Sequence, residues 1–213
     1  AASFTSDASQ LLDAEVYLVA VKDDVIEDVA RLIKINNGII AHTSGTQPKE
    51  LLKSSSGYYG IFYPLQTMKK NLKVDFKNVP VLVEGNNDVT TTKLESLART
   101  ISQNTHRVDE EQRQWIHVAA VFANNFTNHL YGISESLLAE QNLSFEILKP
   151  LIFRAIENLS VSSPNEIQTG PAVRNDKNVI DKHLALLADN QRLQKIYEVL
   201  TASIIASASQ NHK

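Results

Sequence analysis

The segment EVYLVAVKD, residues 15–23, decides the fold of this chain. It opens with a nearly uninterrupted apolar and β-branched run, which is typical of a strand buried on both faces of a parallel sheet. Apolar residues at helical spacing follow from Val25 to Ile33, and residues 39–42 (IIAH) form the next predicted strand. The alternation of strand, helix and strand predicts an α/β domain with a parallel sheet.

The two halves of the chain carry different patterns. The first half contains three more predicted strands, at 58–62, 79–83 and 106–108, and a predicted helix at 90–101. The second half contains only helical patterns, at 109–133, 135–141, 145–159, 177–188 and 190–208. We therefore expect an α/β domain over residues 1–108, followed by an all-α domain over residues 109–213.

Composition excludes several classes of protein. The chain has 213 residues with 21 basic and 24 acidic side chains, and a net charge of −3 does not suit a nucleic-acid binder. Its apolar runs are far shorter than the roughly 20 residues of a membrane span. The absence of cysteine excludes zinc–thiolate sites, and the six histidines show no metal-ligand spacing, so no metal is expected. A reducing compartment fits, and we expect the cytoplasm.

The glycines bear directly on cofactor binding. There are seven, and no two of them are separated by a single residue, so the G-x-G-x-x-G dinucleotide fingerprint is absent from these 213 residues.

Polar side chains follow three of the predicted strands. Ligands of open α/β sheets bind at the carboxyl ends of the strands, where these residues would share one edge. The segments at the strand ends, polar except for Val21, contain Val21, Lys22 and Asp23 after the first strand, His42, Thr43 and Ser44 at the second, and Gln66 and Thr67 after the third. Taken singly, Asp23 could cap a helix, His42 could end a strand and Gln66 could belong to a turn. Their clustering favours a ligand site.

The helix that opens the second half carries a polar stripe. At helical spacing His117, Val121, Asn124 and Asn128 share one face, so an imidazole and two carboxamides project together. Asparagine is a mediocre helix former, so its repeated use here favours a ligand cleft. A solvated face, or a hydrogen-bonded seam against a neighbouring helix, remains the alternative.

A third polar segment lies in the helical half. It contains Gln168, Thr169, Gly170 and Arg174. Gly170 with Pro171 predicts a turn, Asp176 suits the start of a helix, and Arg174 could bind a carboxylate with two hydrogen bonds. A structural loop with a surface arginine is the alternative.

Five motifs together resemble a known family. They are VAVKDD (19–24), AHTSGT (41–46), YPLQT (63–67), HVAAVFANNFTNH (117–129) and QTGPAVRND (168–176). They resemble a family of Rossmann-like NADP oxidoreductases with a C-terminal helical domain of unknown function, and the resemblance spans essentially the whole chain. The family is similar to pyrroline-5-carboxylate reductase and, more distantly, to 2-dehydropantoate reductase and 6-phosphogluconate dehydrogenase.

The resemblance implies roles for these residues. Val21, Lys22 and Asp23 would edge the nicotinamide ribose of NADP, and His42, Thr43 and Ser44 would lie beside the nicotinamide. Gln66, Thr67, His117, Asn124 and Asn128 would face the substrate, and the loop with Gln168, Thr169, Gly170 and Arg174 would close the pocket. The helical domain would be of the 6-phosphogluconate dehydrogenase C-terminal type, which usually forms homodimers.

The resemblance also exposes two departures. Relatives carry a strand, a glycine-rich turn, a helix and a second strand before the equivalent of Ala1, so this chain is expected to lack roughly 40–50 residues of a Rossmann domain. Either the sequence starts late or the natural protein lacks the segment. The first is favoured, because a sheet without its central strand would have an unpaired edge. Tyr63 stands where many relatives carry histidine before the proline.

Two hypotheses follow. The first is an NAD(P)-dependent reductase of a small carbonyl or imine compound with a carboxylate, which Arg174 would anchor. His117 would donate the proton, with His42 in reserve, because histidine titrates near neutrality. The second is a non-catalytic dimeric protein that binds a metabolite or nucleotide with the same Rossmann-like fold.

Overall fold

The computed structural model describes residue 7 and residues 10–68 and 73–211. Contacts group the chain into two compact units, Ala1–Tyr131 and Gly132–Lys213. The first helix of the helical half therefore groups with the sheet, and the unit boundary falls later than the expected domain boundary after residue 108. The assignment of residues 1–108 to nucleotide binding and of residues 109–213 to substrate and dimer contacts stays a prediction.

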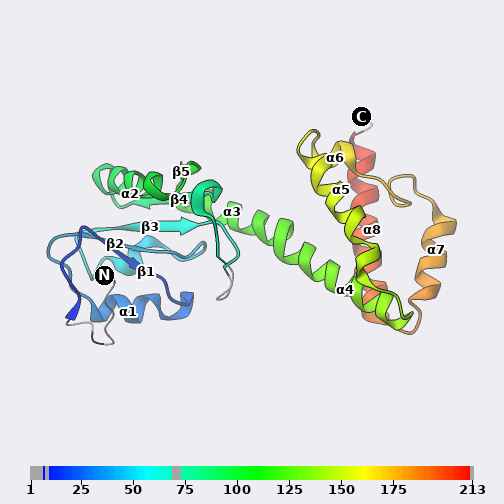
Figure 1. Ribbon diagram of the computed structural model, residues 1–213, viewed down its shortest axis with the longest axis horizontal. Coiled ribbons are helices and arrows are strands. Elements are labelled where there is room, and N and C mark those ends of the chain that lie inside the picture. Colours follow the sequence, from blue (N-terminus) through cyan, green and yellow to red (C-terminus); the bar gives the residue numbers. More distant parts are fainter. Residues whose placement is uncertain (1–6, 8–9, 69–72, 212–213) are drawn as a thin grey trace. The chain divides into compact units, whose positions relative to one another are not determined.

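The first unit is built on a five-stranded sheet (Figure 1). Its strands lie side by side in chain order: β1 (Val16–Val19), β2 (Ile39–His42), β3 (Tyr58–Pro64), β4 (Val81–Gly85) and β5 (Thr105–Arg107). The strands β1, β2 and β3 run parallel, and His42 at the end of β2 pairs with Val19 and Ile61. All five strands coincide with predicted ones, so the Rossmann-like α/β prediction is confirmed.

The pairing of β3 with β4 differs from the expected parallel sheet. These two strands are antiparallel, whereas β4 and β5 are parallel. Parallel neighbours need a crossover connection, usually a helix. Within the described residues, the connection between β3 and β4 holds only a short 3-10 turn, η4 (Phe76–Asn78). The chain therefore turns back beside β3, and the sheet is mostly parallel.

Helices cover both faces of the sheet because side chains alternate along each strand. On one face of the sheet, Ile40 lies in a buried cluster with Ile26 and Ala30. The elements on this face are α1 (Ile26–Leu32), the preceding turn η2 (Asp23–Val25) and the short η3 (Lys49–Leu52). Ile39 and Ala41 pack with α2 (Asp88–Ile101) on the other face. All four residues of β2 are buried, which explains the continuous apolar run.

A long helical segment follows the sheet and changes character along its length. It starts as α3 (Glu110–Ala120), where Asp109 and Gln112 form a reciprocal capping box. It continues as a π-helix, η5 (Val121–Phe126), and then as α4 (Thr127–Glu140). Hydrogen bonds of a π-helix span five residues instead of four, so residues beyond it are rotated relative to a continuous α-helix. The expected stripe from His117 to Asn128 is therefore interrupted before its last member.

The second unit is all-α, as expected. Beyond the end of α4 it contains η6 (Phe145–Ile147), α5 (Lys149–Leu159), α6 (Pro164–Ile167), α7 (Lys177–Leu186) and α8 (Gln191–Asn211). Gly170, with a φ of +112°, and Asn175, with a φ of +49°, turn the chain before α7, whose first turn Asp176 caps through the N–H of Val179. None of the helices in the described part of the chain is long and apolar enough to cross a membrane.

Candidate functional site

The carboxyl ends of β1 and β2 are joined by one carboxylate. Oδ2 of Asp23 accepts hydrogen bonds of 2.8 Å from the hydroxyls of Ser44 and Thr46. The Ser44 hydroxyl oxygen also accepts the N–H groups of Thr46 and Gln47, each at 3.1 Å. The structure thus brings Asp23 and Ser44 together, as their positions after parallel strands predict. Val21 and Lys22 are exposed beside them, and Thr43 is half-buried.

His42 uses both ring nitrogens inside this turn. Its side chain is fully buried. Its Nδ1 accepts the N–H of Ser44 at 3.2 Å, so Nε2 carries the hydrogen and donates to the carbonyl of Pro48 at 3.2 Å. Burial lowers the pKa of His42, and the positive charge of Arg113 lowers it further, against the bond to Pro48. This geometry favours a neutral His42 whose role is to hold the turn, and it does not favour His42 as a proton donor.

The other expected proton donor meets a tyrosine. Oη of Tyr63, near the end of β3, lies 3.1 Å from Nδ1 of His117 on α3, and their ring centroids are 6.2 Å apart. Both side chains are half-buried. Gly45 packs against both rings: a Cβ at this position would lie 2.6 Å from His117 Nδ1 and 2.8 Å from Tyr63 Cζ. A glycine is required here so that the turn, the phenol and the imidazole can meet.

The surroundings of Tyr63 keep its hydroxyl protonated. Burial raises the pKa of the Tyr63 phenol, and the negative charge of Asp23 raises it further, whereas the positive charge of Arg113 opposes both. A protonated phenol can donate to an unprotonated Nδ1 or accept from a protonated one. The Tyr63–His117 pair can therefore hold a proton in either arrangement.

A second polar contact joins the same two segments. Nδ2 of Asn124 in η5 donates to Oγ1 of Thr67 at 2.9 Å, and the N–H of Thr67 donates to the side chain of Gln66. The helical segment thus contacts the end of β3 through His117 and the segment after β3 through Asn124. Asn128 is exposed and has no part in these two contacts, because the π-helix turns it away from the stripe.

A buried arginine, which the sequence analysis missed, completes the site. Arg113 lies one turn before His117 on α3 and is fully buried. Its Nη1 donates to the carbonyl of Ser44 at 3.4 Å, and its Nη2 lies 3.9 Å from Oε2 of Glu84. The spacing of four residues from His117 is the signal that could have revealed it. Tyr63 offered the weaker signal of a polar group near the end of a buried strand.

The loop with Gln168, Thr169, Gly170 and Arg174 belongs to the second unit. Gln168 donates to the carbonyl of its neighbour Thr169, and the side chains of Gln168, Thr169 and Arg174 are exposed. The local turn is as expected, and a role of this loop at the pocket stays a prediction. Among the residues that the structure describes, no group of three or more histidines, aspartates or glutamates could hold a metal ion.

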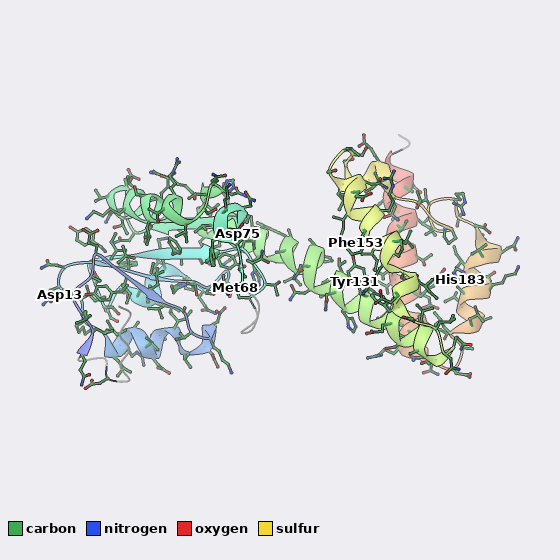
Figure 2. All side chains as sticks on the ribbon, viewed as in Figure 1. Asp13, Met68, Asp75, Tyr131, Phe153 and His183 are labelled. Atoms are coloured by element: carbon green, nitrogen blue, oxygen red, sulfur yellow. The ribbon has the colours of Figure 1, made fainter. Side chains whose placement is uncertain are left out.

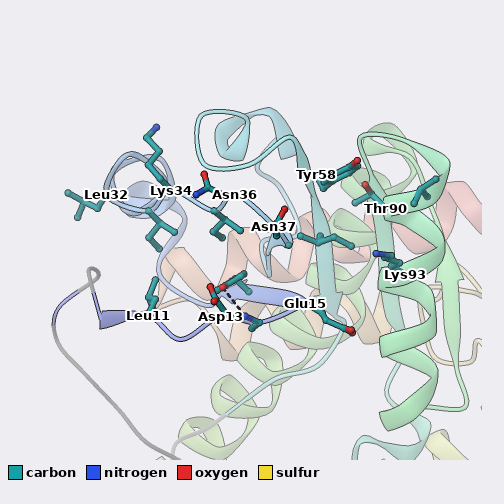
Figure 3. Close-up of a pocket in the computed structure, with 17 residues that line it drawn as sticks. Leu11, Asp13, Glu15, Leu32, Lys34, Asn36, Asn37, Tyr58, Thr90 and Lys93 are labelled. Atoms are coloured by element: carbon teal, nitrogen blue, oxygen red, sulfur yellow. Dashed lines mark hydrogen bonds between the residues drawn. The ribbon is translucent and has the colours of Figure 1, made fainter.

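A sizeable pocket of the first unit lies elsewhere. It has a volume of about 1080 Å³ and lies at the amino-terminal ends of β1, β2 and α2 (Figure 3). Asp13, Glu15, Lys34, Asn37 and Lys93 are among the residues that line it. None of the side chains at the carboxyl ends of the strands contributes to its wall. The pocket and the Tyr63–His117 pair are therefore separate features.

Comparison with known proteins identifies relatives at two distances. The domain of unknown function DUF2520 matches residues 79–204, and no protein of curated function matches the chain. A proposed NADP oxidoreductase from Bacteroides fragilis is 36% identical over 95% of this chain and 80% of its own, with a TM-score of 0.86.

More distant structures share the fold. The 1-pyrroline-5-carboxylate reductase of Streptococcus pyogenes is 12% identical over 92% of this chain and 76% of its own, with a TM-score of 0.55. An imine reductase of Myxococcus stipitatus, in complex with NADP⁺, is 12% identical over 93% of this chain and 76% of its own, with a TM-score of 0.54. At this identity they establish the shared fold of a Rossmann-like domain followed by helices.

Proposed function

Because the chain belongs to the family of the domain of unknown function DUF2520, we propose that it is an NADP-dependent oxidoreductase that reduces a small carbonyl or imine compound. The observation that carries this proposal is the contact between Tyr63 and His117 at the carboxyl end of β3. Reduction of a C=O or C=N bond needs a proton donor within hydrogen-bond reach of the substrate. The described relatives with NADP oxidoreductase, pyrroline-5-carboxylate reductase or imine reductase in their names support the same class.

The residues at the strand ends suit the nicotinamide end of the cofactor. The bonds of Asp23 to Ser44 and Thr46 fix the turn after β2 and leave the exposed Lys22 and the half-buried Thr43 beside it. We assign Val21, Lys22 and Asp23 to the ribose, and His42, Thr43 and Ser44 to the nicotinamide. When bound in its reduced form, NADP would supply the hydride. The seven glycines of the chain form no G-x-G-x-x-G turn, so these residues account for the nicotinamide end and not for the diphosphate.

His117 is the proton donor in this proposal. When the imidazole is protonated, its Nδ1–H donates to Oη of Tyr63 at 3.1 Å, which fixes the orientation of the ring. The Nε2 proton is then transferred to the oxygen or nitrogen of the substrate. The neutral ring keeps its proton on Nδ1, which still donates its hydrogen bond to Oη of Tyr63.

The remaining polar residues are assigned to the substrate. Thr67 and Asn124, joined by their 2.9 Å bond, and the neighbouring Gln66 would form the polar wall beside His117, together with Asn128. Gln168, Thr169 and Gly170 would cover the pocket. We further propose that the substrate is a small molecule with a carboxylate, which Arg174 would bind.

The helical unit supports a homodimer. Its helix α5 exposes four large apolar side chains: Leu151 (68%), Phe153 (60%), Ile156 (55%) and Leu159 (51%) (Figure 2, Phe153). Large apolar side chains exposed on one helix commonly mark a protein contact. We propose that they pack against a second copy of the chain, in a reducing compartment such as the cytoplasm.

The first test is cofactor binding by the full-length protein. NADPH at ~100 times its dissociation constant should stabilise the fold by about 2.7 kcal/mol, and thermal unfolding with NADPH, NADH and no nucleotide measures this. A panel of small imines and ketones, each with and without a carboxylate, is then screened by following NADPH oxidation. Turnover that is lost in His117→Gln at an unchanged melting temperature supports the assignment, and the absence of any nucleotide-dependent stabilisation refutes the proposal.

A non-catalytic binding protein is the second candidate, in which the hydrogen bond between Tyr63 and His117 serves only to join β3 to α3. It predicts stabilisation by a nucleotide or metabolite without turnover of any compound in the panel. It also predicts that His117→Gln lowers the melting temperature, because the histidine would then serve only to hold Tyr63.

A further inference from the structure

Arg113 brings a charge into the interior of the first unit. Its side chain is fully buried, and its partner Glu84 is 12% exposed. Oε1 of Glu84 bonds to Lys49 Nζ at 2.6 Å, whereas Nη2 of Arg113 lies 3.9 Å from the other carboxylate oxygen. Nε and Nη2 of Arg113 and Oε2 of Glu84 have no hydrogen-bond partner among the described residues. A buried ion pair that is only partly bonded is a poor source of stability, so its presence calls for another role.

The hydrogen bond that Arg113 does form leads to the Tyr63–His117 pair. Nη1 donates to the carbonyl oxygen of Ser44 at 3.4 Å, and the next residue is Gly45. Gly45 in turn packs against the imidazole of His117 and the phenol of Tyr63. Arg113 and His117 therefore act on the same turn from successive turns of α3.

The ion pairs tie three elements around this turn. Arg113 comes from α3, Glu84 from β4 and Lys49 from η3, which follows the turn directly. Burial pulls the pKa of Lys49 down, but the hydrogen bond and charge of Glu84 outweigh burial, so this pKa is raised and the ammonium stays charged. The turn at 42–48 is thus held from the helix side and from the sheet side.

The charge of Arg113 also reaches one member of the pair, Tyr63. It lowers the pKa of the Tyr63 phenol against the combined effect of burial and Asp23, and it contributes to the lowered pKa of His42 in the same turn. The guanidinium thus acts on the ionisation of Tyr63 as well as on the position of Gly45.

We propose that Arg113 is a positioning residue for the Tyr63–His117 pair: its guanidinium holds the carbonyl of Ser44 and thereby seats Gly45 against both rings. The catalytic meaning of this role rests on the proposed function. The geometric role does not, because it concerns only contacts within the first unit.

The test uses four variants of the protein. Arg113→Met/Glu84→Gln removes the guanidinium together with the carboxylate charge that faces it, and it is compared with Glu84→Gln, which retains Arg113. Arg113→Lys keeps the charge but loses the planar guanidinium. Arg107→Met, which breaks an exposed pair with Glu95, is the control for loss of an arginine elsewhere.

Two spectroscopic readouts distinguish positioning from a purely structural role. The first is the pH titration of the Tyr63 hydroxyl by NMR with labelled tyrosine, and the second is the nuclear Overhauser contact between the Tyr63 and His117 rings. Relative to Glu84→Gln, the double variant should move the Tyr63 titration to higher pH and lose the ring contact, and Arg113→Lys should retain the titration and weaken the contact. A folded double variant with an unchanged titration and ring contact, and only a lower melting temperature, overturns the proposal.

Turnover then separates this proposal from the proposed function. With a reducible substrate in hand, the double variant should lower kcat on the order of 100-fold relative to Glu84→Gln, with a smaller change in KM, because misplacement of a donor by about 1 Å has effects of this size. Absence of nucleotide binding and turnover in the wild-type protein would refute the proposed function and leave the spectroscopic result standing. Wild-type turnover with an undiminished kcat in the double variant would refute the role of Arg113 in positioning the donor.

Discussion

The hydroxyl of Tyr63 lies 3.1 Å from Nδ1 of His117, although the two residues are 54 positions apart in the chain. One comes from the end of a strand and the other from a helix that starts after the sheet is complete. Gly45, in a third segment, fills the space beside both rings. A proton donor that depends on three separate segments can be tested at each of them.

Removal of the Tyr63 hydroxyl should impair turnover far more than folding. Tyr63→Phe keeps the ring and deletes one hydrogen bond, so the free energy of unfolding should fall by about 1 kcal/mol. Because the His117 ring loses the group that orients it, kcat should fall on the order of 100-fold. Tyr17→Phe is the matched control, since Tyr17 also uses its hydroxyl in hydrogen bonds, to Leu12 and Ala14, away from the site. Equal rates for the two variants would contradict the role of Tyr63.

A methyl group on Gly45 should push the two rings apart. In Gly45→Ala the new Cβ would lie 2.6 Å from His117 Nδ1, closer than van der Waals contact allows, so the free energy of unfolding should fall by about 1–3 kcal/mol. Gly57→Ala is the control, because a Cβ there meets no atom within 4 Å. Chemical denaturation measures both variants. Similar stability of the two would show that the turn adapts and that the close packing is not required.

The buried carboxylate of Glu84 should be far more costly to remove than an exposed one. Glu84→Gln leaves Lys49 and Arg113 without their shared counter-ion, and loss of one partner from a buried pair destabilises proteins by about 3 kcal/mol. Glu27→Gln removes the exposed partner of Arg31 and should cost less than about 1 kcal/mol. Urea denaturation at neutral pH gives both values. A cost below about 1 kcal/mol for Glu84→Gln would show that the cluster is well solvated.

His42 should make the protein sensitive to mild acid. Its pKa in the folded chain is below the ordinary value of 6.5, so on acidification the unfolded chain binds a proton before the folded chain does. The contribution of neutral His42 to the free energy of unfolding is thus complete above pH 6.5 and is lost as the pH falls below this value. The free energy of unfolding changes by at most about 1.4 kcal/mol per pH unit through this residue.

The variant His42→Gln removes this titration. It should be less stable than the wild type at pH 8 or so, because two buried hydrogen bonds change, but its stability should fall less steeply between about pH 7 and pH 5. His106→Gln, at an exposed position, is the control for loss of a histidine elsewhere. Parallel pH profiles of the wild type and His42→Gln would refute a lowered pKa for His42.

The exposed apolar side chains of α5 should control assembly. Phe153→Glu places a charge among them, and the dissociation constant of a dimer that buries them should rise at least about tenfold. Light scattering after size-exclusion chromatography measures the mass across a concentration series. Lys195→Gln, at an exposed position of α8, lowers the charge by the same single unit away from these side chains. A mass that is monomeric for the wild type would contradict the homodimer.

The sequence by itself determined the elements and their order. The continuous apolar run of β1, the buried β2 and the helical periodicities of the second half are local patterns, and a local pattern suffices to identify a strand or a helix. The shared edge of Asp23 and Ser44 was also predictable, because parallel strands with crossover connections place their carboxyl ends together.

Only the tertiary structure decided which side chains meet. The antiparallel turn-back of β4, the π-helix that separates Asn128 from His117 and the burial of Arg113 beside Ser44 all depend on how elements distant in the chain pack. Tyr63 reaches His117 because Gly45 leaves room for both, and a glycine in a sequence does not reveal which neighbours it admits. Periodicity fixes the face on which a residue lies, whereas its partner is fixed by the packing of the whole sheet and helix.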